Sequence, residues 1–243
     1  MKIAGKKLSG ISALHYGKLV VRSVLFLSVL AAYLLDRAGD LARSFPLLLT
    51  VWVFYVVEMI LRFFPSRLES MGCQKQFARN YRPTGTPLPR SRTGRSTAAV
   101  AAAWLLLNGA IGGLYFAGIL DVGILILISL AYSVCDIVCI LFFCPFQTWF
   151  MKNRCCTTCR IYNWDFAMMF TPLVFIPRPY TYSLLGLSLL LLLRWEITWR
   201  RHPERFLPET NACLACRNCD EKLCSHKTQL QSFLKKHRDR LFS

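Results

Sequence analysis

The sequence predicts an all-α fold, a polytopic transmembrane helical bundle of about six spans with a small cysteine-rich cytoplasmic tail. The first observation behind this is composition, because 54% of the 243 residues are hydrophobic and only 18% are charged, against about 25% charged residues in soluble domains. The mean hydropathy of +0.38 agrees. The second observation is that the charges gather in a few blocks. The stretches between them approach the roughly 20 apolar residues that a membrane-spanning helix needs.

Five stretches are long and apolar enough to be spans, and a sixth is ambiguous. The five are 19–35, 45–64, 97–120, 122–146 and 180–199. Arg22 lies in the first, and we expect its long side chain to reach the lipid headgroups. We expect this first stretch to be an uncleaved span rather than a signal peptide, because Asp36 and Arg37 follow it without a small-residue cleavage site. The sixth stretch, 159–176, is short and contains Pro172, so it is either a kinked span or a re-entrant segment.

The distribution of Lys and Arg sets the expected orientation. With six spans, 27 of the 30 basic residues fall on one side, and only Arg37, Arg43 and Arg178 fall on the other. Basic residues favour the cytoplasmic side, so we expect a multi-pass protein of the inner or plasma membrane with both termini in the cytoplasm. A re-entrant 159–176 would place the basic tail outside, and the charge pattern therefore favours a sixth span.

The same pattern divides the chain into four parts. These are an N-terminal two-span hairpin (1–64), a basic Pro/Gly-rich cytoplasmic linker (65–96), a four-span membrane unit (97–201) with a cytoplasmic cysteine loop (144–160), and a cytoplasmic cysteine-rich tail (202–243) that ends in an amphipathic basic helix. The net charge of +17 indicates contact with anionic lipid. No nucleic acid is expected as a partner, because no nucleic-acid-binding motif accompanies the charge. Gly109 and Gly113 predict close helix packing, within the chain or in a homodimer.

Eleven cysteines are the main functional signal. The cytosol keeps thiols reduced, so clustered cysteines on that side indicate metal binding or redox chemistry rather than structural disulfides. Two groups predict metal sites: Cys144, Cys155, Cys156 and Cys159 in the loop, and Cys213, Cys216, Cys219 and Cys224 in the tail. Alternatively, the two Cys-x2-Cys pairs, one from each group, share a single zinc site. The expected cofactor is an iron–sulfur cluster or zinc.

Two of these motifs resemble known patterns. The tail pattern C-x2-C-x2-C-x4-C resembles the C-x2-C-x2-C-x3-C-P run of bacterial ferredoxins, with a longer last gap and without the proline. Cys139, Cys144 and Pro145 at the end of the fourth span resemble the Cys-x3-Cys-Pro signature of membrane-anchored iron–sulfur proteins that serve periplasmic nitrate and nitrous oxide reductases. Here the gap is again one residue longer, and Gln147 stands where those proteins have glycine. The resemblance implies electron transfer across or along the membrane.

Four polar or reactive residues lie inside expected spans, where such groups are costly and often functional. Glu58 is one helical turn from Arg62, so we expect an ion pair between them unless Glu58 lines a functional cavity. Asp136 is expected to be protonated and hydrogen-bonded to a neighbouring helix. Alternatively, it acts with Cys135 and Cys139 in metal binding, proton relay or thiol redox chemistry.

These observations lead to three functional hypotheses. The first is a membrane metal–thiolate protein that transfers electrons between a cytoplasmic donor and a membrane acceptor, such as a quinone or a partner subunit. The second is a transporter or membrane assembly protein with structural zinc–cysteine sites. The third is a membrane enzyme that uses Cys135, Asp136 and Cys139. No Walker, GxGxxG, HExxH or GxSxG motif is present, so nothing indicates a nucleotide or hydrolase site.

Overall fold

The computed structural model describes residues 2–3, 6–7, 10–35, 45–65, 71–88, 94–151 and 155–218. The regular secondary structure of these residues is helical, as predicted, apart from a short antiparallel pair of strands, β1 (Lys2–Ile3) and β2 (Lys6–Lys7). The longer helices are α1 (Gly10–Leu35), α2 (Phe45–Leu61), α4 (Arg95–Phe116), α5 (Val122–Leu141) and α7 (Pro179–Arg201). Two shorter α-helices are α3 (Met71–Gln76) and α6 (Asp165–Phe170), and 3₁₀ turns lie in several of the connections.

Three helices in the described residues are long and apolar enough to cross a membrane. They are Ala13–Leu35 within α1, the whole of α4 and the whole of α5. Helix α2 is apolar but shorter, with 17 residues. Large apolar side chains point outward from these helices; Leu106 and Phe116 on α4 are 75% and 77% exposed. Such a surface is unfavourable in water and fits a hydrocarbon environment.

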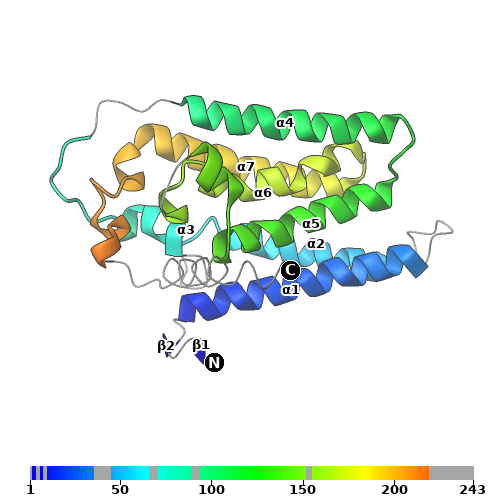
Figure 1. The fold of residues 1–243 in the computed structure, drawn as a ribbon, viewed down its shortest axis with the longest axis horizontal. Coiled ribbons are helices and arrows are strands. Elements are labelled where there is room, and N and C mark those ends of the chain that lie inside the picture. Colours follow the sequence, from blue (N-terminus) through cyan, green and yellow to red (C-terminus); the bar gives the residue numbers. More distant parts are fainter. Residues whose placement is uncertain are drawn as a thin grey trace, which may run out of the picture.

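The helices lie side by side, and helices distant in sequence are neighbours (Figure 1). Helix α1 packs along α5, α2 packs on α7, and α6 contacts both α5 and α7. Helices α5 and α7 run in the same direction, so the chain between them has to return along the bundle (Figure 1). Helix α6 and the 3₁₀ turn Thr171–Phe175 form part of this return. The ambiguous stretch 159–176 is therefore a broken helical segment packed against the bundle.

The break in this segment lies next to Pro172, at the start of the 3₁₀ turn. Proline lacks a backbone N–H and disfavours the α conformation in the residue before it, which explains why one regular helix does not continue. Phe175 at the end of the turn packs against α4 at Gly112, where a Cβ would overlap the Phe175 ring. At Gly109 and Gly113 a Cβ would have no atom of the described residues within 4 Å. Among the described residues, Gly112 rather than Gly109 or Gly113 makes a close helix contact, and packing of the other two in a homodimer stays a prediction.

The main core lies where α2, α5, α6 and α7 meet. Its most buried members include Tyr55, Met59, Leu125, Phe166, Phe170, Leu191 and Trp195. Aromatic rings meet edge-on there, with the Tyr55 and Phe170 centroids 5.3 Å apart. This core fixes α6 against α5, and it thereby fixes the spacing between the two elements that carry the site described next.

The ends of α2, α5 and α7 lie at the same end of the bundle as the start of α4, and the cysteine loop and α3 lie there too (Figure 1). Helix α3 connects two of these pieces, because the Gln76 side chain donates to the Thr157 carbonyl (3.1 Å) and the Asn211 side chain donates to the Lys75 carbonyl (2.9 Å). Part of the predicted linker 65–96 is thus folded between the cysteine loop and the start of the tail.

Candidate functional site: a cavity lined by cysteines

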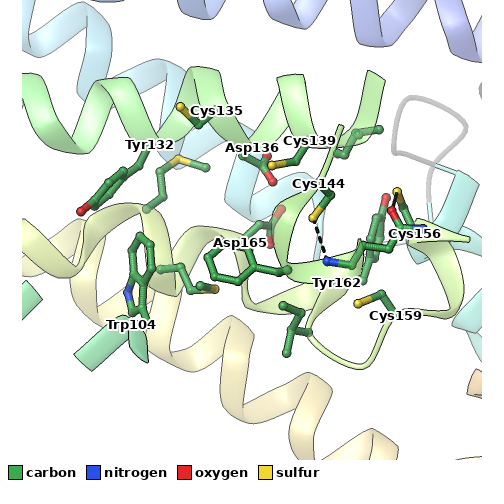
Figure 2. A pocket seen from close by; sticks show the side chains of 16 residues that line it. Trp104, Tyr132, Cys135, Asp136, Cys139, Cys144, Cys156, Cys159, Tyr162 and Asp165 are labelled. Atoms are coloured by element: carbon green, nitrogen blue, oxygen red, sulfur yellow. Dashed lines mark hydrogen bonds between the residues drawn. The ribbon is translucent and has the colours of Figure 1, made fainter. Parts of the chain in front are cut away.

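A cavity of about 140 Å³ lies between α4, α5, α6 and the cysteine loop. Five thiols from two regions of the sequence line it, with two carboxylates and several aromatic and methionine side chains. The thiols are those of Cys135, Cys139, Cys144, Cys156 and Cys159, and the carboxylates are those of Asp136 and Asp165. Figure 2 shows Tyr132 and Cys135 at one end of this group and Cys156 and Cys159 at the other.

The end of α5 brings two of these thiols together. Helix α5 stops at Leu141 because Phe142 leaves the helical conformation (φ −120°, ψ −70°), and the chain turns before the short π-helix Phe146–Phe150. This turn directs Cys144 back toward Cys139, and both thiols line the cavity (Figure 2). The Gln147 backbone N–H also donates to the Cys144 sulfur (3.4 Å), an interaction that favours the thiolate form of a cysteine.

The cysteine loop supplies the other pair. Cys156 lies in the 3₁₀ turn Cys156–Thr158, and its thiol donates to the Gln147 side-chain oxygen (3.0 Å). Cys159 is buried, and burial raises the pKa of its thiol to about 11, although backbone N–H groups of residues 160 and 161 favour the thiolate. Cys155 contacts the Thr157 hydroxyl (3.0 Å) and is not among the residues that line the cavity.

Asp165 contributes a carboxylate with one oxygen available. It is the first residue of α6, and its Oδ2 accepts an ion-pair contact from Arg62 at 2.6 Å. Its other oxygen, Oδ1, is buried and has no hydrogen-bond partner among the described residues. Arg62 is held in turn against the Phe166 ring, 4.9 Å from the ring centre. Figure 2 shows the Asp165 side chain directed toward α5, where Asp136 and Cys139 lie.

A second group of charges lies behind the cavity. Arg22 on α1 is completely buried, and its guanidinium bonds Glu58 of α2 (2.9 Å), Asp136 of α5 (3.0 Å) and the Ser133 carbonyl (2.8 Å). Lys18 also pairs with Glu58, at 2.8 Å. The group joins three helices through charges that compensate each other, the arrangement that buried ions require.

This network corrects two expectations and identifies the partner in a third. Arg22 does not reach the lipid headgroups, because it is enclosed by two carboxylates. Glu58 pairs with Lys18 and Arg22 rather than with Arg62, which pairs with Asp165. Asp136 does bond to a neighbouring helix, as expected, and its partner there is the Arg22 guanidinium on α1. The partners of Arg22 and Glu58 were missed because they lie on other helices, and sequence spacing shows only partners on the same helix.

The tail cysteines are described only in part. The Cys213 thiol donates to the Asn80 carbonyl (3.1 Å) and Cys216 is exposed, while Cys219 and Cys224 lie outside the described residues. Helix α3 contacts both the turn that contains Cys156 and the turn that contains Cys213. Cys73 on α3 is completely buried, and sequence reasoning did not single it out because it lies outside any spaced motif.

The described residues contain no group of three or more His, Cys, Asp or Glu side chains arranged to hold a metal ion. The nine cysteines in this part of the chain are free of disulfides. Three members of the predicted loop group, Cys144, Cys156 and Cys159, line the cavity. Cys155 does not line it, whereas Cys139 of α5 does. The two metal sites therefore stay predictions, and the cavity with its dithiols is what the described residues assemble.

Comparison with known proteins does not assign the chain to a family. No family model matches it, and no curated protein or solved structure matches it. The class of protein is thus defined by the molecule alone, as a helical bundle with three candidate membrane spans and a thiol-lined cavity at one end.

Proposed function

We propose that the protein is an integral membrane protein of six spans that transfers electrons through cysteine thiols. The observation that carries this is that Cys139 and Cys144 line one cavity together with Cys156 and Cys159. A disulfide is about 2.05 Å long, so the two sulfurs of a pair have to approach each other to form one. Cys144 lies beyond the end of α5 and has the turn 142–145 to supply that movement.

The two pairs form a relay for two electrons. Oxidation of Cys139 and Cys144 to a disulfide releases two electrons and two protons. Thiol–disulfide exchange then lets Cys156 and Cys159 reduce that disulfide, becoming a disulfide themselves while the protons pass to the two released thiols. The loop pair lies at the end of the bundle, whereas Cys139 lies in the last turn of a candidate span, with Cys144 just beyond it. Electrons would thus enter from the loop side and reach the membrane side.

The six-span topology is part of the same proposal. Three candidate spans are evident, and the apolar α2, the broken segment 159–176 and α7 would supply the others. In this arrangement both termini lie in the cytoplasm, together with the cysteine loop and the basic residues that favour contact with anionic lipid.

A redox titration of the purified full-length protein tests the thiol proposal. The protein is equilibrated with mixtures of reduced and oxidised dithiothreitol, quenched in acid and alkylated, and its peptides are analysed by mass spectrometry. We expect a reversible Cys139–Cys144 disulfide. It should be lost in Cys139→Ser and retained in Cys155→Ser, the matched control from the loop. Thiols that stay reduced across the whole series would contradict the proposal.

A metal–thiolate centre in electron transfer is the second candidate. Its support is that both Cys-x2-Cys turns pack on α3, which brings cysteines from the loop and from the tail to the same short helix. The centre would take an iron–sulfur cluster or zinc at the tail group Cys213, Cys216, Cys219 and Cys224 or at the loop group. Anaerobic purification separates the candidates: bound iron with sulfide, or stoichiometric zinc, favours this one, and a metal-free protein excludes it.

A further inference from the structure

The cavity reaches the surface of the molecule at a candidate membrane span. Cys135 both lines the cavity and is exposed, and it lies in the second half of α5. Trp104 and Tyr132 form the wall beside it, with their ring centres 4.7 Å apart. A molecule that entered past Cys135 would come from the hydrocarbon region rather than from water, because α4 and α5 are both candidate spans.

The volume of the cavity limits what can enter. A cavity of about 150 Å³ engineered into another protein binds benzene, so about 140 Å³ accommodates one six-membered ring. Pockets for nucleotide-sized ligands are larger, at roughly 300–1,000 Å³. A flavin or nicotinamide dinucleotide therefore does not fit, whereas the ring of a benzoquinone does, with its lipid tail left outside.

The part of the cavity lined by Cys139, Cys144 and Asp165 holds an electron source and a proton acceptor, and the reduction of a quinone needs both. Cys139 and Cys144 supply two electrons, and the free Oδ1 of Asp165 is a buried carboxylate oxygen placed to take a proton. A buried carboxylate with one unused oxygen is costly unless it has a partner or a task. Arg62 holds the carboxylate by its other oxygen and fixes its direction.

We propose that this cavity binds the ring of a membrane benzoquinone, which accepts the electrons of the Cys139–Cys144 pair while Asp165 accepts a thiol proton. This inference rests on the proposed thiol function and names its electron acceptor. The other redox partner of the relay would act on Cys156 and Cys159 at the opposite end of the cavity (Figure 2).

The reaction balances with the quinone as the oxidant. Asp165 takes the proton of Cys144, whose thiolate is favoured by the Gln147 N–H, and the Cys144 sulfur adds to the quinone ring. The Cys139 sulfur then attacks the Cys144 sulfur, so the S–S bond forms and the S–C bond breaks. The electron pair of the S–C bond stays on the ring. The proton held by Asp165 and the proton of Cys139 pass to the ring oxygens, and a hydroquinone leaves.

The test uses the full-length protein in lipid nanodiscs, reduced and then freed of reductant without oxygen. Decylubiquinone is added, and its reduction is followed by ultraviolet absorbance while quenched samples are mapped for disulfides. We expect one hydroquinone for each two-electron disulfide formed, with Cys139–Cys144 among the disulfides. Met168→Trp, which places an indole in the cavity, should slow the reaction at least tenfold. Leu106→Trp, on the exposed face of α4, should leave the rate unchanged.

Asp165→Asn tests the proton acceptor. General bases contribute about 10²–10⁴-fold to rates, so we expect the initial rate to fall at least 100-fold. We also expect the rate of the variant to rise tenfold per pH unit, because the thiol then loses its proton only to solvent. A variant with the rate and pH profile of the wild type would overturn the role of Asp165. Diamide should still form the Cys139–Cys144 disulfide in this variant, and this result checks that the variant is folded.

The outcomes separate this inference from the function on which it rests. If diamide forms the Cys139–Cys144 disulfide and decylubiquinone does not, the quinone inference is wrong and the thiol function stands. If neither reagent forms that disulfide in the wild type, the thiol function itself is wrong. Equal rates for Met168→Trp and the wild type would show that the quinone reacts elsewhere.

Discussion

Arg22 joins three helices by a single side chain. Its guanidinium is completely buried and bonds carboxylates from α2 and α5. In the sequence of the first span alone, Arg22 lies close to one end, where a basic residue can reach the membrane surface. The packed helices enclose it instead. Buried ion pairs contribute little net stability, but removing one partner leaves the other charge unpaired and costs several kcal/mol.

We therefore expect Arg22→Met to destabilise the protein by about 3–5 kcal/mol, because Glu58 and Asp136 then lose the cation that lies between them. Lys18→Met is the matched control, since Lys18 is more exposed and its ion pair among the described residues is with Glu58; its effect should be smaller. Reversible unfolding in mixed detergent micelles measures both. Equal stability of Arg22→Met and the wild type would contradict the network.

Cys159 gives a prediction about pH. Burial raises the pKa of its thiol to about 11 from an ordinary value of 9.0, so the reactive thiolate forms only at higher pH in the folded protein. Alkylation of Cys159 by iodoacetamide should reach half its maximal rate near pH 11 when the protein is native and near pH 9 when it is denatured. Peptide mass spectrometry measures the rate at this cysteine. A native midpoint at or below pH 9 would be the contrary result.

For single residues, the sequence predicted which side chains carry reactive groups better than it predicted which residues those side chains contact. Spacing within motifs singled out Cys139, Cys144, Cys156 and Cys159, and all four line the cavity. Spacing did not predict that Cys155 points elsewhere, because adjacent cysteines differ in direction and a 3₁₀ turn decides which one faces inward. It also did not predict the partner of Asp165, which lies about 100 positions earlier in the chain.

Contacts between α4 and the segment that begins with α6 determine how far apart two walls of the cavity lie. Helix α6 is short and ends at a proline-containing turn, and Phe175 of that turn packs into the gap at Gly112 of α4. The Trp104 indole also donates to the Thr171 hydroxyl (3.1 Å). These contacts hold α4 beside α6, and a cavity wall made by α4 depends on them.

Gly112→Ala should therefore destabilise the protein by about 1–3 kcal/mol, the usual cost of overpacking, because the added methyl group overlaps the Phe175 ring. Gly109→Ala is a matched control one turn away, where a Cβ meets no described atom within 4 Å. It should be neutral or stabilising by up to about 1 kcal/mol, since alanine is the better helix former. Thermal unfolding in the same detergent compares the two variants, and the opposite order would refute this packing.

Hydropathy predicted most of the elements correctly, because a long apolar run has few alternatives to a helix. Helices α4 and α5 lie within the predicted stretches 97–120 and 122–146 to within a few residues. The same method could not predict how 159–176 folds. That segment is stabilised by buried contacts of Phe166, Phe170 and Leu173 with other helices, and its own sequence contains a helix-breaking proline.

For the whole molecule, the proposed topology makes opposite ends of the bundle accessible from opposite sides of the membrane. Ile119, in the turn between α4 and α5, is 66% exposed, and Cys216 is exposed at the other end. In intact cells a membrane-impermeant maleimide should label Ile119→Cys from outside. It should label Cys216 only after the membrane is permeabilised. Labelling of Cys216 in intact cells would contradict a cytoplasmic tail.

The most direct measurement of the central claim is the redox state of Cys139 and Cys144 in native membranes. Membranes are quenched in acid, free thiols are alkylated, and the peptides are analysed by mass spectrometry with and without prior reduction. The account predicts a disulfide that joins Cys139 to Cys144 in part of the molecules. This disulfide should disappear under reducing conditions and return on oxidation, in the wild type and in Cys155→Ser alike. Two thiols that stay reduced under every condition, or a disulfide that joins either residue to a different cysteine, would contradict it.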